Sequence, residues 1–183
     1  MCIEIEAKLK VDSLSKVERK LAELGADFRA EQLQTDFLFD DANATLTMSD
    51  RCLRLRRQSV GGSEKFFLTY KGAKEKSNFK KRQEIEIEIK DAESMQKLLS
   101  ALGYERVLIV EKKRRLWKLG CCAVALDKLP LLGDFVEIEG PDESKIAAVQ
   151  KELGLAELRH IAKSYASLIK SKLNETGKEQ MTL

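Results

Sequence analysis

The sequence is poor in the residues from which disulfide frameworks and histidine-based sites are built. Its four cysteines, Cys2, Cys52, Cys121 and Cys122, show no CxxC spacing, and two of them are adjacent. This pattern disfavours a simple disulfide framework and indicates reduced thiols. The chain has one histidine, His160, and a lone histidine in a helix-rich region is more often structural than catalytic.

Long apolar segments and a secretion signal are also missing. The chain begins MCIEIEAK, which is acidic and alternating where a signal peptide would be basic and then apolar. No run approaches the roughly 18 apolar residues of a membrane-spanning helix. We therefore expect a soluble, cytoplasmic protein that has no membrane partner.

Neither sign of charge is in large excess. Lysine and arginine number 33, aspartate and glutamate 30, and the net charge of +3 is too small to indicate a nucleic-acid duplex as partner. Total charge, in contrast, is high: 34% of residues are charged, against about 25% in an average domain. The apolar share of 43% is that of a globular protein. The excess of positive and negative side chains therefore indicates a functional role for them.

Strict alternation of apolar and charged residues predicts strands in several places. Residues 3–11 read IEIEAKLKV and residues 82–90 read RQEIEIEIK, both with a period of two. Further strands are predicted at 33–40, 52–58, 65–71, 106–119, 122–128 and 134–139, and helices at 14–24, 92–102, 142–153 and 159–173.

This pattern predicts an α+β fold in which eight antiparallel strands close into a β-barrel. Closure removes exposed strand edges, and the amphipathic helices can cover the apolar outside of the barrel. The length of 183 residues fits one domain, which we place at residues 1–173, with a loose polar tail at 174–183.

Each predicted strand carries its charges on one face. A single such face is more often a solvated surface, but the helices need apolar strand faces to pack against. The apolar faces therefore point outward, and the charged faces line the inside of the barrel. By parity the inward side chains are Glu4, Glu6, Lys8, Arg54, Arg56, Glu84, Glu86, Lys112, Arg114, Glu137 and Glu139.

A barrel interior that contains both signs of charge indicates a ligand and a metal ion, because buried charges are costly unless they are paired or bind something. Lysine and arginine can hold the oxygens of a triphosphate. Carboxylates would repel that ligand, but they suit Mg²⁺ or Mn²⁺, which bridge carboxylates to phosphates. Phosphoryl transfer depends mainly on positioning and charge neutralisation, and this interior supplies both.

An ordered series of motifs resembles the CYTH domain of the triphosphate tunnel metalloenzymes. The series begins with ExExK at Glu4 to Lys8 and ends with KSYASLI at Lys163 to Ile169. Between them lie LRLR, LTYKG, RxExE, KxR, a strand ending in Leu126-Asp127, and GxFVEIEG. The resemblance covers roughly residues 3–170 and implies an eight-stranded antiparallel tunnel.

The resemblance also implies roles for individual residues. It assigns metal binding to Glu4, Glu6, Glu137 and Glu139, the phosphate path to Lys8, Arg54, Arg56, Lys71, Arg82, Lys112 and Arg114, and an opposite acidic wall to Glu84 and Glu86. Asp127 and Lys8 are the expected catalytic residues, with Asp127 orienting or deprotonating the nucleophile or taking part in a second metal site. Parity favours Lys112 with Arg114 over a register slipped by one residue. Tyr165 is either a packing residue or a contact at the end of the tunnel.

Three functions remain open at this point. The first is metal-dependent hydrolysis of inorganic or organic triphosphate, and the second is cyclisation of ATP to cyclic AMP by a class IV adenylate cyclase. Both reactions use the same tunnel and differ in the attacking group. The third is a non-catalytic module that binds polyphosphate or nucleotide, although such a module would gain nothing from the carboxylates. The partner is a triphosphate-containing small molecule in each case, and the chain is a monomer or a homodimer.

Overall fold

The computed structural model describes residues 2–176. Its strands are β1 (Cys2–Lys10), β2 (Asp27–Asp40), β3 (Cys52–Val60), β4 (Ser63–Lys71), β5 (Lys80–Ile89), β6 (Glu105–Leu119), β7 (Cys122–Leu129) and β8 (Gly133–Glu139). Its helices are α1 (Leu14–Glu23), α2 (Thr45–Met48), α3 (Ala92–Ala101), α4 (Glu143–Glu152) and α5 (Tyr165–Thr176). The expected tail at 174–183 contributes its first three residues to α5, and residues 177–183 lie outside the described part of the chain.

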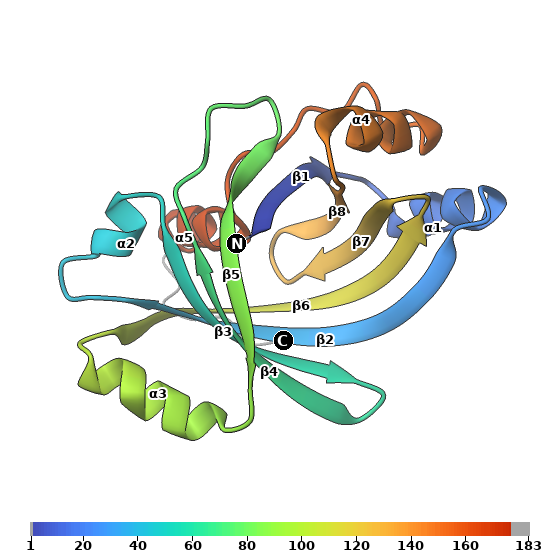
Figure 1. The fold of residues 1–183 in the computed structure, drawn as a ribbon. Coiled ribbons are helices and arrows are strands. Elements are labelled where there is room, and N and C mark those ends of the chain that lie inside the picture. The colour runs from blue at the N-terminus through green and yellow to red at the C-terminus, as the bar shows by residue number, and fades with distance from the viewer. Residues whose placement is uncertain (1, 177–183) are drawn as a thin grey trace.

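The eight strands form a closed antiparallel barrel, as the sequence predicts (Figure 1). The strand order around the barrel is β1-β5-β4-β3-β2-β6-β7-β8. A tight turn at Gly61-Gly62 joins β3 to β4, and both glycines have positive φ values, 56° and 86°. A side chain at either position would strain this turn, which explains the glycine pair in the sequence.

Apolar strand faces point outward and are covered by helices. Ala7 and Leu9 of β1, with Val136 and Ile138 of β8, belong to a buried cluster that includes Leu21 of α1. Residues of α4 complete the same cluster, and α3 covers a second one around Leu55 of β3. Figure 1 shows α1, α3 and α4 outside the barrel wall. The apolar faces of these strands therefore point outward, as their parity predicts, and the charged faces line the interior.

The last helix departs from this arrangement. α5 packs against Leu38, Val110 and Phe135, and each of these lies two residues from an inward-facing charged residue. The interior of the barrel is thus apolar at one end, and α5 occupies that end. The helix also begins at Tyr165, six residues later than the predicted start at 159, because the preceding segment is held by other contacts such as the bond from Ile161 N to Lys8 O (2.8 Å).

Other differences from the predicted elements are small. β2 begins at Asp27, six residues before the predicted start, because its first half pairs with the long strand β6. The short helix α2 was not predicted, since four residues show no helical period. Within residues 2–176, no helix is both long enough and apolar enough to cross a membrane.

Candidate functional site

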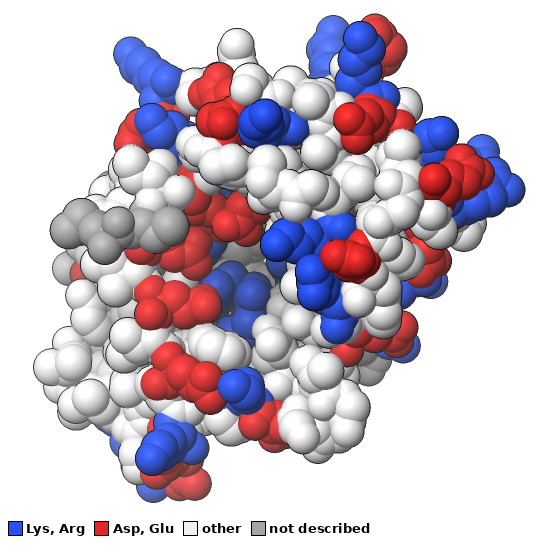
Figure 2. Space-filling view, turned by 45° about the vertical axis from the view of Figure 1, so that its right-hand side comes forward, with Lys and Arg blue, Asp and Glu red and all other residues white. Residues whose placement is uncertain are grey.

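A charged cavity of about 590 Å³ occupies the interior of the barrel. Basic side chains reach it from five strands: Lys8 from β1, Arg54 and Arg56 from β3, Lys71 from β4, Lys80 and Arg82 from β5, and Lys112 and Arg114 from β6. Carboxylates reach it from β1, β2, β5 and β8. Figure 2 shows the opening, with acidic side chains gathered along one side and basic side chains opposite and at its floor. The sequence-predicted site residues all line this cavity except Asp127.

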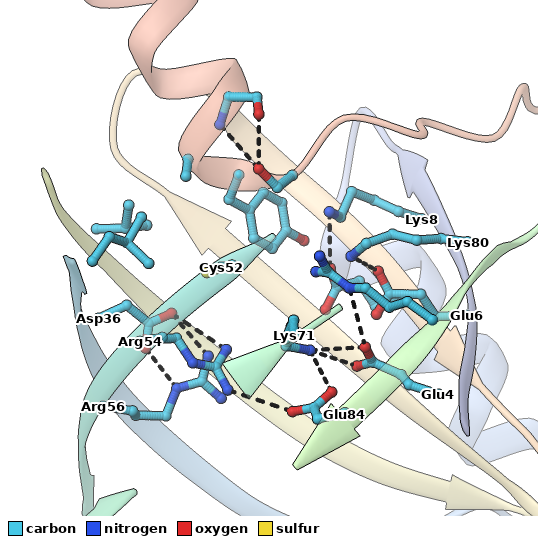
Figure 3. Close-up of a pocket in the computed structure, with 18 of the residues that line it drawn as sticks. Glu4, Glu6, Lys8, Asp36, Cys52, Arg54, Arg56, Lys71, Lys80 and Glu84 are labelled. Carbon is cyan, nitrogen blue, oxygen red and sulfur yellow. Dashed lines mark hydrogen bonds and ion pairs between the residues drawn. The ribbon is translucent and has the colours of Figure 1, made fainter. Parts of the chain in front are cut away.

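Glu4 and Glu84 share one lysine on the acidic side (Figure 3). Lys71 Nζ donates to both carboxylate oxygens of Glu4 (2.9 and 2.8 Å) and to Glu84 Oε2 (2.5 Å). Burial alone would raise the pKa of Glu84, but Lys71 outweighs it and the pKa is lowered. The carboxylate of Glu84 is therefore held in its charged form, which is the form that binds a cation.

Glu6 and Glu139 lie directly opposite each other on β1 and β8. Glu6 is paired with Lys80 at 2.5 Å, whereas Glu139 forms no ion pair with any other residue in the range 2–176. Burial, followed by the charges of Glu4, Glu6 and Glu84, raises the pKa of Glu139 to about 7. Like charges opposed across two strands are unfavourable, so this corner of the cavity carries an excess of negative charge.

This excess fits a divalent cation. Oxygen donors from several carboxylates are the ligands that Mg²⁺ and Mn²⁺ prefer, and a cation would relieve the repulsion at Glu139. The site is not a rigid cage, however: across residues 2–176 no three acidic, histidine or cysteine side chains are already gathered in a metal-binding arrangement. Lysines hold Glu4 and Glu6 instead, so a metal must compete with Lys71 and Lys80 for them.

Arg54 and Arg56 project from β3 and share Asp36 of β2. Arg56 forms a two-point contact with Asp36 at 2.6 and 2.8 Å, and Arg54 lies 3.8 Å from the same carboxylate. Burial would raise the pKa of Asp36, but the two guanidinium groups hold it well below its usual range. Asp36 therefore fixes a pair of arginines side by side, and Figure 3 shows both directed into the cavity.

Asp127 holds a second pair of cations, from β6. Its carboxylate accepts from Arg114 Nε at 2.7 Å and Arg114 Nη2 at 2.5 Å, and Lys112 Nζ lies 3.5 Å away. Burial lowers the pKa of Lys112 to about 7, and the neighbouring Arg114 adds to this effect. Asp127 is fully buried behind these groups. The structure thus places Asp127 behind the cavity lining, and the catalytic role expected of it stays a prediction.

Lys8 of β1 and Glu137 of β8 form an ion pair in the cavity wall. Lys8 Nζ lies 3.3 Å from Glu137 Oε1, and Arg114 contacts the other oxygen of Glu137. Burial lowers the pKa of Lys8 despite the adjacent carboxylate. Burial would raise the pKa of Glu137, but Lys8 and Arg114 outweigh it, and the pKa lies well below its usual range. Glu137 therefore links the two basic groups of β1 and β6.

Sequence reasoning missed Asp36 and Lys80. Lys80 shares the parity of Arg82 and Glu84, but the predicted strand begins two residues too late to include it. Asp36 lies in an apolar stretch, TDFLFD, and its role is visible only once β2 is paired with β3, which places it opposite Arg56. Tyr165 is a contact at the end of the cavity: its hydroxyl donates to Asp127 Oδ2 at 2.9 Å.

His160, which is not expected to be catalytic, has structural contacts. His160 contacts Gln150 Oε1 through Nε2 at 2.8 Å and the backbone oxygen of Asn78 through Nδ1 at 3.1 Å. Cys52, Cys121 and Cys122 are free thiols, in agreement with the expectation.

Comparisons with known proteins converge on one family. The sequence profile described as the CYTH domain matches residues 2–165. A protein of Methanocaldococcus jannaschii, named as a candidate adenylate cyclase, is 31% identical over 175 residues, which cover 91% of this chain and 98% of that protein. The adenylate cyclase CyaB of Aeromonas hydrophila is 27% identical over 180 residues, with coverage of 93% and 90%.

Solved structures agree with these sequence matches. The PH1819 protein of Pyrococcus horikoshii superposes with a TM-score of 0.81 at 29% identity, covering 92% of this chain and 99% of that one. A Hippeastrum protein described as a candidate adenylyl cyclase with a dominant triphosphatase activity superposes with a TM-score of 0.70 at 19% identity, covering 96% and 97%. The second likeness concerns the fold alone.

Proposed function

The protein belongs to the CYTH-domain family, and we propose that it is a divalent-metal-dependent enzyme that hydrolyses a triphosphate, either inorganic triphosphate or an organic triphosphate. The observation that carries this proposal is the convergence of basic side chains from five strands on one cavity that also has a carboxylate corner. A triphosphate bound together with a metal ion uses both features of the cavity. The basic side chains neutralise the charge of the phosphates, and the carboxylates supply oxygen donors to the metal.

The basic groups support a chain of phosphate positions. Arg54 and Arg56 form one pair, Lys112 and Arg114 form a second, and Glu137 links Lys8 to the second pair through Arg114. The Nε atoms of Arg54 and Arg82 are buried and have no hydrogen-bond acceptor within the described chain. Buried donors are normally satisfied, so these side chains leave donor capacity that an anion can use.

The carboxylates Glu4, Glu6, Glu137 and Glu139 are proposed to hold Mg²⁺ or Mn²⁺, with Glu84 and Glu86 on the adjoining wall. Bound there, the ion would neutralise charge on the phosphate oxygens. Lys71 and Lys80, which pair with Glu4 and Glu6, would then be free to contact phosphate. Metal binding and phosphate binding are thus coupled, because the ion pairs Lys71–Glu4 and Lys80–Glu6 join the proposed metal ligands to the basic groups.

In the proposed hydrolysis a water molecule attacks a phosphorus atom, and the bond to the bridging oxygen breaks. Lys8 lines the cavity beside Glu137, and it can neutralise the charge that develops on the transferred group. Asp127 acts through Arg114 and Lys112 by fixing their positions. The positively charged side chains orient the ligand, and the barrel wall limits its access to water.

Cyclisation of ATP is the second candidate, favoured by the adenylate cyclase names of two relatives. In that reaction the 3′-hydroxyl of the ribose replaces water as the attacking group. The deciding assay presents inorganic triphosphate, ATP and other organic triphosphates with Mg²⁺ or Mn²⁺, and measures phosphate, pyrophosphate and cyclic AMP separately. We expect phosphate release that is abolished by chelation. Cyclic AMP with stoichiometric pyrophosphate would identify the cyclase, and tight binding without any product would identify a binding module.

A further inference from the structure

α5 contributes one aromatic residue to the charged cavity. Tyr165, the first residue of the helix, is buried and lines the cavity beside Lys8 and Lys112. Its ring packs edge-on against Phe135 of β8, with centroids 5.2 Å apart. The ring is therefore held from the barrel side, and the body of α5 is held by the buried residues Ile169 and Leu173.

Two ammonium groups from different strands lie against this ring. Lys8 Nζ of β1 is 4.1 Å from the ring centroid, and Lys112 Nζ of β6 is 4.9 Å from it. An ammonium group over an aromatic face is stabilised by about 0.5–2 kcal/mol, with the larger values in buried sites. Both lysines are almost fully buried, so the ring replaces part of the hydration that they have lost.

The hydroxyl of Tyr165 acts on a third group. It donates to Asp127 Oδ2 at 2.9 Å, and the same carboxylate holds Arg114 and lies 3.5 Å from Lys112. The backbone next to Tyr165 adds a further contact, because Lys8 Nζ donates to Lys163 O at 3.2 Å. The start of α5 thus contacts Lys8 in two ways, Lys112 directly and Arg114 through Asp127.

We propose that Tyr165 is a positioning residue for the phosphate-binding cations of β1 and β6. The ring fixes the separation of Lys8 from Lys112, and the hydroxyl fixes Asp127 and with it the direction of Arg114. This inference rests on the proposed function, because it assumes that these cations bind the triphosphate. It makes the start of α5 part of the site, although the body of the helix packs on apolar residues.

The two halves of the side chain can be separated by substitution. Tyr165→Phe keeps the ring and removes the hydroxyl, so Lys8 and Lys112 stay in place and Asp127 loses one donor. We expect kcat to fall about tenfold, the effect of roughly 1.4 kcal/mol, with KM for inorganic triphosphate changed less than about threefold. Tyr165→Leu removes both parts, and we expect KM to rise about tenfold as well as the loss in kcat.

Ile169→Val is the matched control, because it weakens the packing of the same helix without touching the cations. All measurements are made well below the melting temperature of each variant. Values of kcat and KM within twofold of the control in both Tyr165 variants would overturn the inference. If the wild-type protein acts on no triphosphate, the proposed function fails by itself, and that result is seen before any variant is made.

A second readout does not depend on turnover. In protein whose lysines carry ¹³C at Cε, the chemical shift of each lysine signal shows whether the Tyr165 ring lies next to that lysine. We expect the signals of Lys8 and Lys112, assigned by Lys→Arg variants, to keep their ring-induced shifts in Tyr165→Phe and to lose them in Tyr165→Leu. Unchanged shifts in Tyr165→Leu would show that the ring does not position the lysines, whatever the catalytic result.

Discussion

At the scale of single residues, the site is governed by how each charge is balanced. Asp36, Glu84 and Glu137 each have a lysine or arginine partner that holds the pKa of the carboxyl below its ordinary value, where burial alone would raise it. Glu139 and Lys112 behave in the opposite way, since burial and like charges shift both pKa values to about 7. The charges of both residues should therefore change within the physiological pH range.

Glu139→Gln is expected to stabilise the protein while it impairs catalysis. The pKa of Glu139 is about 7 in the folded chain against an ordinary value of 4.5, so the folded state binds more protons and the free energy of unfolding falls as pH rises between these values. Near pH 4.5 variant and wild type should be equally stable. Above about pH 7 the variant should gain on the order of 1 kcal/mol after allowance for solvent screening, or about 2–4 °C.

Thermal unfolding at several pH values measures this difference. Glu88→Gln is the control, because Glu88 is an exposed carboxylate paired with Lys65 at 3.3 Å. Its effect should be small and nearly independent of pH. A Glu139→Gln variant that is less stable than wild type at pH 8 would contradict the charge excess inferred for this corner. Metal-dependent turnover of the variant should fall, because one proposed ligand loses its charge.

Lys112 should make triphosphate affinity depend on pH. Below about pH 7 Lys112 is charged, and an anion binds without proton uptake. Above that value Lys112 is neutral in the free protein, and it must take up a proton when the triphosphate binds. The affinity for triphosphate should therefore fall by up to about tenfold per pH unit. The fall ends at the pH where the triphosphate binds to the protein with Lys112 neutral. Calorimetry with inorganic triphosphate in the presence of a chelator isolates this effect from metal binding.

Lys112→Arg is the comparison, because arginine stays charged throughout. The titration of the triphosphate itself and of Glu139 occurs with both proteins and cancels in the ratio of their affinities. That ratio should shift toward the arginine variant as pH rises from about 6 to 9. Parallel affinity curves would mean that Lys112 is already charged above pH 7, or that it does not contact the phosphates.

At the scale of elements, the helices have two different tasks. α1, α3 and α4 cover the outer wall, whereas α5 packs on residues that face the interior. The outer helices stabilise the barrel without touching the site. Substitutions in them should therefore change stability and leave the chemistry intact, in contrast to those at the start of α5.

α3 offers a matched pair for testing this division. Leu99 is buried against Phe39 and Leu55, and its neighbour Leu98 is about half exposed. Leu99→Ala should lower the free energy of unfolding by about 2–4 kcal/mol, through the lost transfer energy and the cavity left behind, whereas Leu98→Ala should cost less than about 0.5 kcal/mol. Denaturant unfolding gives both values.

Turnover on triphosphate at a temperature where both variants are folded should match wild type. A large catalytic defect in Leu99→Ala, with the protein still folded, would show that the outer helix communicates with the cavity. That result would refute the division of tasks between α3 and α5.

At the scale of the whole molecule, the closed barrel creates a cavity whose charges are held in place by one another. Ligand binding should therefore be visible as stabilisation of the entire fold. At a concentration of inorganic triphosphate about 100 times its Kd, the free energy of unfolding should rise by about 2.7 kcal/mol. The corresponding increase in melting temperature is about 5–10 °C for a chain of this size.

Arg56→Gln tests whether the stabilisation arises in the cavity. Arg56 contacts Asp36, and Arg54 remains to pair with that carboxylate, so the variant should fold. We expect most of the triphosphate-induced increase in melting temperature to disappear. Arg57→Gln, which replaces a half-exposed arginine of the same strand paired with Glu64, should respond as wild type does. Equal stabilisation of all three proteins would place the phosphates elsewhere.

The sequence by itself determined the barrel and most of the cavity lining. Period-two alternation fixes which side chains share a strand face, and the amphipathic helices require the apolar faces to point outward. Those two rules were enough to assign Glu4, Glu6 and Lys8 to the interior, and the ordered motifs identified the family. Such information is local, because it depends only on neighbours along one strand or one helix.

Tertiary structure alone decided which charges meet. Asp36 faces Arg56 because of the β2–β3 register, and that pairing cannot be read from either strand alone. The buried position of Asp127 and its bond to Tyr165 depend on where α5 docks, 38 residues later in the chain. The physical reason is that parity selects a face, whereas the distance between two charges, and therefore their pKa values and roles, is set by strand register and helix packing across the whole barrel.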